Sequence, residues 1–80
     1  MRLDKYLKVS RIIKRRTVAN DACDASHVSI NGRPAKASYD VKIGDIIEVS
    51  FGGRTVRIQV TNIVDTTKKA DAADMYRVLE

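Results

Sequence analysis

The spacing of hydrophobic residues changes along the chain, from a helical period near the start to a period of two later on. Leu3 and Leu7 are four residues apart and share one face of a helix. Hydrophobic and polar residues alternate in residues 28–30, 47–51 and 56–60, which is typical of strands that bury one face. The pattern therefore predicts helices first and strands afterwards.

The opening residues are expected to form the first helix. It places Asp4 four residues before Lys8, which is the favourable order for an ion pair within a helix. Tyr6 lies beside Leu7 in the sequence and is expected in the core. The alternative for Tyr6 is that its ring stacks on a nucleic-acid base.

A second helix is expected over residues 18–26, with Thr17 as its N-cap. Small hydrophobic residues would give it a narrow face that packs closely: Val18, Ala19, Ala22 and Ala25. Cys23 is expected to be a small buried residue, because a reactive thiol needs a positively charged setting and the neighbours here are Asp21 and Asp24.

Turns and a last strand are expected in the C-terminal part of the chain. Asn31 and Gly32 form the strongest hairpin signal, because both central residues of a type I′ turn need a positive φ. Residues 75–79 are expected to add an edge strand, and residues 65–74 a short helix, capped by one of its threonines, or a loop.

The order of these elements indicates an α+β fold, in which two N-terminal helices pack on one face of a small twisted antiparallel sheet. A chain of 80 residues is expected to form one domain over residues 1–80. Its hydrophobic content of 44% is that of a globular protein and not of a disordered one.

The positive charge of the chain is concentrated at its N-terminus. Residues 1–16 hold seven basic side chains and one acidic one, a net charge of +6, whereas the other residues sum to −1. So little interleaved acid favours a surface that binds a polyanion over a merely solvated helix face. The charge alone does not distinguish RNA from DNA.

The sequence offers little that could support catalysis or hold a metal or cofactor. Its single histidine, His27, lies at a helix-to-strand junction, where it is expected to be a surface or capping residue. No Cys-His spacing suggests zinc, and no glycine-rich loop suggests a nucleotide site. We therefore expect a protein that is not an enzyme and has no cofactor. Without a spanning segment or secretory signal, it is expected in the cytoplasm.

Several short motifs resemble the S4 RNA-binding domain family, in the right order and spacing over about residues 1–50. These motifs are Arg2-Leu3-Asp4, Arg16-Thr17, Val28 to Gly32, Lys36 to Ser38 and Gly44-Asp45. The resemblance implies two helices on a small sheet, with RNA held by the helices and the nearby turn. Residues 51–80 would then add a C-terminal strand and short helix.

The whole chain is similar to the RqcP family of small bacterial ribosome-quality-control proteins. That resemblance implies binding to rRNA and peptidyl-tRNA on an obstructed large ribosomal subunit, as a monomer. It also implies work beside the tailing factor RqcH, which adds C-terminal alanine tails to stalled chains. The heat-shock ribosome-recycling proteins are the alternative family. A DNA-binding module and an anionic-membrane or protein-interaction module are weaker alternatives.

Arg2 and Arg16 are the first candidates for RNA binding, because they match the family positions that approach RNA and arginine can bind two phosphate oxygens at once. Asp4 is expected either to support the helix or to orient Arg2 or Arg16, and it could also accept hydrogen bonds from RNA. Other basic residues are expected to widen the surface: Lys5, Lys8, Arg11, Lys14, Arg15, Arg33 and Lys36.

Overall fold

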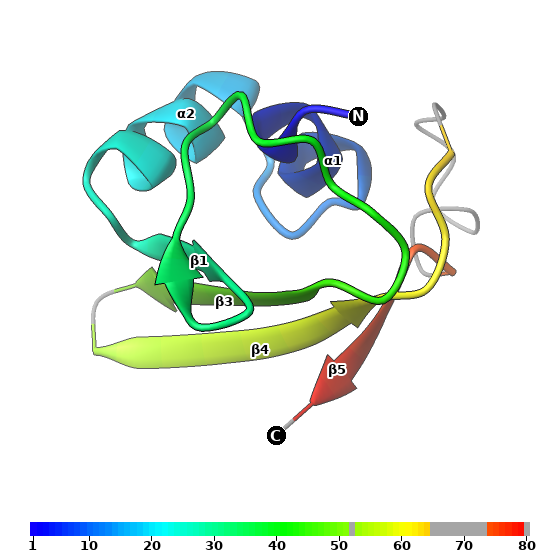
Figure 1. Cartoon of the computed structure of the whole chain (residues 1–80). Coiled ribbons are helices and arrows are strands. Elements are labelled where there is room, and N and C mark those ends of the chain that lie inside the picture. Colours follow the sequence, from blue (N-terminus) through cyan, green and yellow to red (C-terminus); the bar gives the residue numbers. More distant parts are fainter. Residues whose placement is uncertain (52, 65–73, 80) are drawn as a thin grey trace.

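The computed structural model describes residues 1–51, 53–64 and 74–79. The elements are α1 (Leu3–Val9), α2 (Arg16–Asp24), β1 (Val28–Ile30), β2 (Arg33–Pro34), β3 (Ile46–Phe51), β4 (Arg54–Val60) and β5 (Tyr76–Leu79). The strands form one antiparallel sheet in the order β2-β1-β3-β4-β5, and both helices lie over the same face of it (Figure 1). The expected α+β fold is confirmed.

The core lies between the helices and the sheet. Leu3, Leu7 and Tyr6 of α1 are fully buried, as are Ile47 and Ile58, which face each other across β3 and β4. The Tyr6 hydroxyl donates a hydrogen bond to the carbonyl of Met75 at 2.7 Å, which ties α1 to the residue before β5. Tyr6 is therefore a core residue, as expected, and it cannot stack on a base.

The hairpin between β1 and β2 has the predicted turn. Asn31 has φ 51° and Gly32 has φ 85°, and Ile30 pairs with Arg33. Positive φ at both central residues is the signature of the type I′ turn that the Asn-Gly pair predicted.

The segment after β2 runs along the start of α1 (Figure 1). The N–H of Leu3 donates to the carbonyl of Tyr39 at 2.8 Å, and the N–H of Asp4 donates to the carbonyl of Ala37 at 3.2 Å. These bonds satisfy N–H groups that the first turn of a helix leaves without intrahelical partners. They also fix the direction in which α1 leaves the loop.

The prediction that Thr17 caps the second helix is wrong. α2 begins at Arg16, so Thr17 lies inside its first turn, and the cap position is taken by Arg15 without a side-chain hydrogen bond.

The predicted buried face of α2 is also wrong in part. Val18 and Ala25 are exposed, whereas Ala19, Ala22 and Cys23 are buried. The predicted face and the observed face both have the three- and four-residue spacing of one side of a helix. They differ only in which side of the helix they occupy. The spacing of hydrophobic residues is the same for both faces, so it does not predict which one is buried. The packing of α2 against α1 determines that.

The predicted C-terminal strand is confirmed as β5, which pairs with β4 from Arg57↔Leu79 to Val60↔Tyr76. A helix or loop was expected over residues 65–74. Of these, residues 65–73 lie outside the described residues, so this expectation is not tested. Within the described part of the chain, no helix has the length and apolar character needed to cross a membrane.

Candidate nucleic-acid interface

The carboxylate of Asp4 collects hydrogen bonds from four residues. Arg2 approaches it with two nitrogens, Nε at 3.2 Å from Oδ1 and Nη2 at 3.3 Å from Oδ2. The Nε of Arg16 lies 3.4 Å from Oδ2, and Asn20 Nδ2 donates to Oδ2 at 3.3 Å. The backbone N–H of Lys5 completes the set at 2.8 Å from Oδ1. We call these five residues the Asp4 cluster.

The Asp4 cluster keeps a net positive charge. Burial raises the pKa of the Asp4 carboxyl, but the hydrogen bonds from Arg2, Asn20, Arg16 and the Lys5 N–H together outweigh burial and hold that pKa below its ordinary value of 3.8. Asp4 is therefore ionised at neutral pH. One carboxylate cannot neutralise two guanidinium groups, and its side chain is only 3% exposed, whereas those of Arg2 and Arg16 are 51% and 47% exposed.

The two helices bring the Asp4 cluster together. Asp4 lies in the first turn of α1, and Arg2 is the residue that precedes that helix. Arg16 opens α2, and Asn20 follows one turn later on the same side of it. The packing of α1 against α2 thus joins positions separated by 12 and 16 residues in the chain.

The predicted ion pair between Asp4 and Lys8 is wrong. The Asp4 side chain instead turns toward Arg2 and Arg16, whose guanidinium groups approach both of its carboxylate oxygens. The other interpretation of Asp4, that it orients an arginine, agrees with the geometry and applies to both arginines.

A second group of cations lies at the far end of α1. Lys8, Arg11 and Lys14 line one hollow together with Val9. Arg11 has φ 63°, a left-handed conformation that residues with a side chain rarely adopt. Of the remaining N-terminal cations, Lys5 is half-buried on α1 and Arg15 is exposed just before α2.

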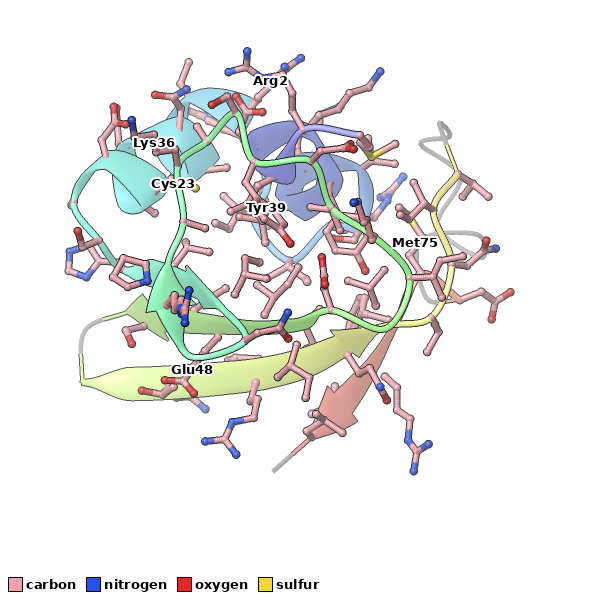
Figure 2. All side chains as sticks on the ribbon, in the orientation of Figure 1. Arg2, Cys23, Lys36, Tyr39, Glu48 and Met75 are labelled. Carbon is pink, nitrogen blue, oxygen red and sulfur yellow. The ribbon has the colours of Figure 1, made fainter. Side chains whose placement is uncertain are left out.

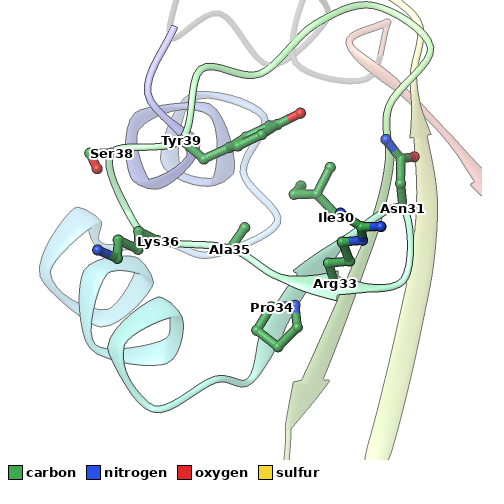
Figure 3. Close-up of a pocket in the computed structure, with 8 residues that line it drawn as sticks. All are labelled: Ile30, Asn31, Arg33, Pro34, Ala35, Lys36, Ser38 and Tyr39. Carbon is green, nitrogen blue, oxygen red and sulfur yellow. The ribbon is translucent and has the colours of Figure 1, made fainter.

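A third group extends the basic surface toward the β1–β2 hairpin. Lys36 is exposed and lines a hollow together with Arg2 and Asn20, so it adjoins the Asp4 cluster. Figure 2 shows Arg2 and Lys36 on the helix side of the molecule, with Glu48 on the sheet below. Arg33 is exposed on β2 and shares a further hollow with Lys36 (Figure 3).

Asn20 is a member of the site that the sequence analysis missed. It is half-buried on α2 and donates a hydrogen bond to Asp4. Its position four residues after Arg16 was the available signal, because residues with that spacing share a helix face.

The surroundings of Cys23 and His27 do not favour a role as a nucleophile or as a metal ligand. Burial, with the negative charges of Asp4 and Asp24, raises the pKa of the Cys23 thiol to about 11, so the thiol is protonated and acts as a small hydrophobic residue, as expected. His27 is exposed, which confirms the prediction of a surface position. The described residues contain no group of three or more side chains that could hold a metal ion.

The chemistry that this surface supports is the binding of phosphates. Each arginine of the Asp4 cluster uses only some of its five N–H donors on Asp4, and each is half exposed. A guanidinium group held in one orientation can bind phosphate oxygens at a lower entropic cost than a free side chain. The arrangement is thus suited to a rigid, phosphate-rich ligand.

Comparison with known proteins places the chain in a family. The S4 domain family matches residues 1–47. A protein of Bacillus subtilis named RQC P-site tRNA stabilizing factor is 58% identical over 80 residues, which cover 100% of this chain and 93% of that protein. A protein of Streptococcus pneumoniae with the same name is 52% identical over 79 residues, covering 99% of this chain and 90% of that protein.

A solved structure has the same fold as this chain. The trimeric structure of Vibrio cholerae Heat Shock Protein 15 matches with a TM-score of 0.91 and 32% identity, over 99% of this chain and 81% of that one. The resemblance expected from the short motifs is confirmed: this chain belongs to the S4 domain family and, within it, to the group of proteins named RQC P-site tRNA stabilizing factor.

Proposed function

We propose that this chain is a non-catalytic RNA-binding factor of ribosome-associated quality control. It binds rRNA and peptidyl-tRNA on an obstructed large ribosomal subunit and supports the addition of C-terminal alanine tails by RqcH. The observation that carries the proposal is the Asp4 cluster, in which one buried carboxylate orients two half-exposed arginines on the helix face. It acts in the cytoplasm, on the ribosome, as a monomer.

The names of the relatives support the ribosomal part of the proposal. The proteins of Bacillus subtilis and Streptococcus pneumoniae are named for stabilising a P-site tRNA, and they match this chain over almost its whole length. A rigid basic surface fits such a ligand, because folded RNA is bound largely through its shape and its phosphates.

The RNA-binding residues are those that match the family motifs and those that adjoin them. Arg2 and Arg16 bind phosphates as oriented guanidinium groups, and Asp4 holds both in place. Lys36 extends the surface beside Arg2. Further cations contribute charge around it: Lys5, Lys8, Arg11, Lys14, Arg15 and Arg33.

A recycling factor of the heat-shock type is the second candidate, because the Vibrio cholerae protein has nearly the same fold. A P-site factor requires a tRNA on the large subunit.

Co-sedimentation with isolated bacterial large subunits tests the proposal. We expect the chain to sediment with subunits that carry peptidyl-tRNA, and to sediment less with empty subunits or with duplex DNA. Arg16→Ala should reduce the bound fraction, because it removes one oriented phosphate ligand. Equal binding to empty and loaded subunits would contradict a role at a P-site tRNA, and unchanged binding of Arg16→Ala would contradict the assigned interface.

Arg77→Ala is the matched control for charge. Arg77 is exposed on β5 and pairs with Gln59, next to the buried Ile58 in β4. Because neighbouring strand residues point to opposite faces, Arg77 belongs to the face away from the helices. Its loss lowers the net charge as much as the loss of Arg16 and should leave binding unchanged.

A further inference from the structure

A hollow lies beside the Asp4 cluster, between the β1–β2 hairpin and the segment that follows it (Figure 3). Ile30, Pro34 and Ala35 give it a hydrophobic lining. Figure 3 shows Tyr39 on one side of this hollow and Pro34 on the other. Hydrophobic groups and an aromatic ring are the kinds of surface on which a nucleobase stacks.

The charged side chains that line the hollow are both cations. Arg33 and Lys36 line it and are exposed. None of its lining residues, all of which belong to the described part of the chain, is acidic. Lys36 also lines the neighbouring hollow that contains Arg2, so this one lysine stands between the Asp4 cluster and the hydrophobic hollow.

The walls of the hollow are held in place by hydrogen bonds. The hydroxyl of Tyr39 donates to Asp45 Oδ2 at 3.0 Å, a bond that raises the pKa of the phenol and keeps it protonated. Asn31 donates from Nδ2 to Asp45 Oδ1 at 3.3 Å and accepts at Oδ1 the N–H of Ile46 at 3.0 Å. A site formed in advance loses little conformational freedom when a ligand enters.

We propose that this hollow takes a single unpaired RNA base, while Lys36 and Arg33 bind the phosphates on either side of it. The proposal rests on the proposed RNA-binding function and makes it more specific. The Asp4 cluster holds the phosphates of a helix, and the hollow holds the base that leaves the stack next to that helix. The preferred ligand is thus a bulge or loop adjoining a stem, not a continuous duplex.

Two features favour a base over an acidic peptide. The hollow offers a hydrophobic lining and an aromatic ring at one place, whereas the cations lie at its rim, which matches the separation of base and phosphate along an RNA strand. The hollow is also continuous with the Asp4 cluster through Lys36, so one strand can occupy both.

Binding to a matched pair of RNA hairpins tests the proposal. The two share one stem, and one of them carries a single bulged 2-aminopurine. We expect wild type to bind the bulged hairpin about tenfold more tightly, at the low end of what one stacked base contributes. The fluorescence of the bulged base should fall on binding. Arg33→Ala should remove most of the preference, because it weakens binding of the bulged hairpin more than binding of the paired one.

Arg77→Ala is the control and should keep the full preference, because Arg77 lies on β5, at the opposite edge of the sheet from β2. Equal affinity of wild type for both hairpins would overturn the base site and leave RNA binding intact. Failure to bind either hairpin would instead contradict the proposed function. Displacement of the bulged RNA by a polyglutamate peptide from wild type but not from Arg33→Ala would assign the hollow to a protein partner, which also overturns the proposal.

Discussion

Asp4 and Arg16 are twelve residues apart in the chain, and Asp4 Oδ2 lies 3.4 Å from Arg16 Nε in the fold. The carboxylate is buried and the guanidinium group is half exposed, so the pair joins the core to the surface. Besides its contribution to stability, the pair fixes the orientation of the half-exposed arginine. Asp4 holds Arg2 in the same way.

Acid should destabilise the protein partly through Asp4. Its pKa in the fold lies below the ordinary value, so the stabilisation is complete above the unfolded pKa of about 3.9 and is lost as the pH falls through the lower folded pKa. The thermal midpoint, followed by circular dichroism from about pH 5 to about pH 2, should therefore fall less in Asp4→Asn than in wild type.

Some acid sensitivity should remain in Asp4→Asn. The carboxyl of Asp40 has a pKa below its ordinary value, because it accepts a hydrogen bond from the N-terminal amino group at 2.8 Å. If the thermal midpoint fell equally with pH in Asp4→Asn and in wild type, the charge of Asp4 would make no contribution to stability.

Arg16→Ala should change the salt dependence of RNA binding. If about five phosphates are contacted, log affinity for a structured RNA should fall against log salt with a slope of about −4. Removing one phosphate ligand should reduce that slope by about one. The thermal midpoint should change little, because Asp4 keeps the bonds of Arg2, Asn20 and the Lys5 N–H. A large loss of stability with unchanged affinity would contradict the role of Arg16.

Arg11→Gly should separate stability from binding. Arg11 has φ 63° directly after the end of α1, a conformation in which glycine is favoured by about 1 kcal/mol. The variant should thus exceed Arg11→Ala in its free energy of unfolding, measured in urea, and bind structured RNA about three- to tenfold more weakly than wild type. Unchanged RNA affinity would show that the backbone strain at Arg11 has no connection with binding.

Gly32→Ala should cost stability through the backbone alone. Gly32 has φ 85°, and a Cβ there would meet nothing within 4 Å, so we expect a loss of about 1 kcal/mol without a clash. Gly53 has the same φ and equally open space, so Gly53→Ala should cost as much. Only Gly32→Ala should weaken the preference for a bulged hairpin, because Gly32 belongs to the turn that positions Arg33. Equal losses of preference in both variants would contradict this.

Much of the fold was predictable from local patterns. The Asn31-Gly32 turn follows from the φ values that those two residues tolerate, and β3 and β4 follow from alternation. The phase of α2 was not predictable, because Val18 and Ala19 give faces of equal hydrophobic spacing. Which face is buried depends on the packing with α1, a non-local contact.

The candidate site was predictable in its residues and less so in its geometry. Arg2, Asp4 and Arg16 follow from the family motifs, and the structure brings them together. The predicted ion pair between Asp4 and Lys8 was wrong. The rule that residues four apart form ion pairs describes the exposed surface of a helix, whereas Asp4 points into the contact between two helices. Asn20 was missed for the same reason, since its partner lies 16 residues away.

The affinity of Asp4→Asn for a structured RNA hairpin tests the central claim most directly, at fixed salt and at a temperature where circular dichroism shows both proteins folded. The substitution raises the net charge by one and leaves an amide that cannot accept from both arginines as a carboxylate does. We expect binding about tenfold weaker than wild type, a change of about 1.4 kcal/mol, despite the added positive charge. Equal or tighter binding would contradict the claim, because it would show that the amount of charge, and not the orientation of Arg2 and Arg16, governs RNA binding.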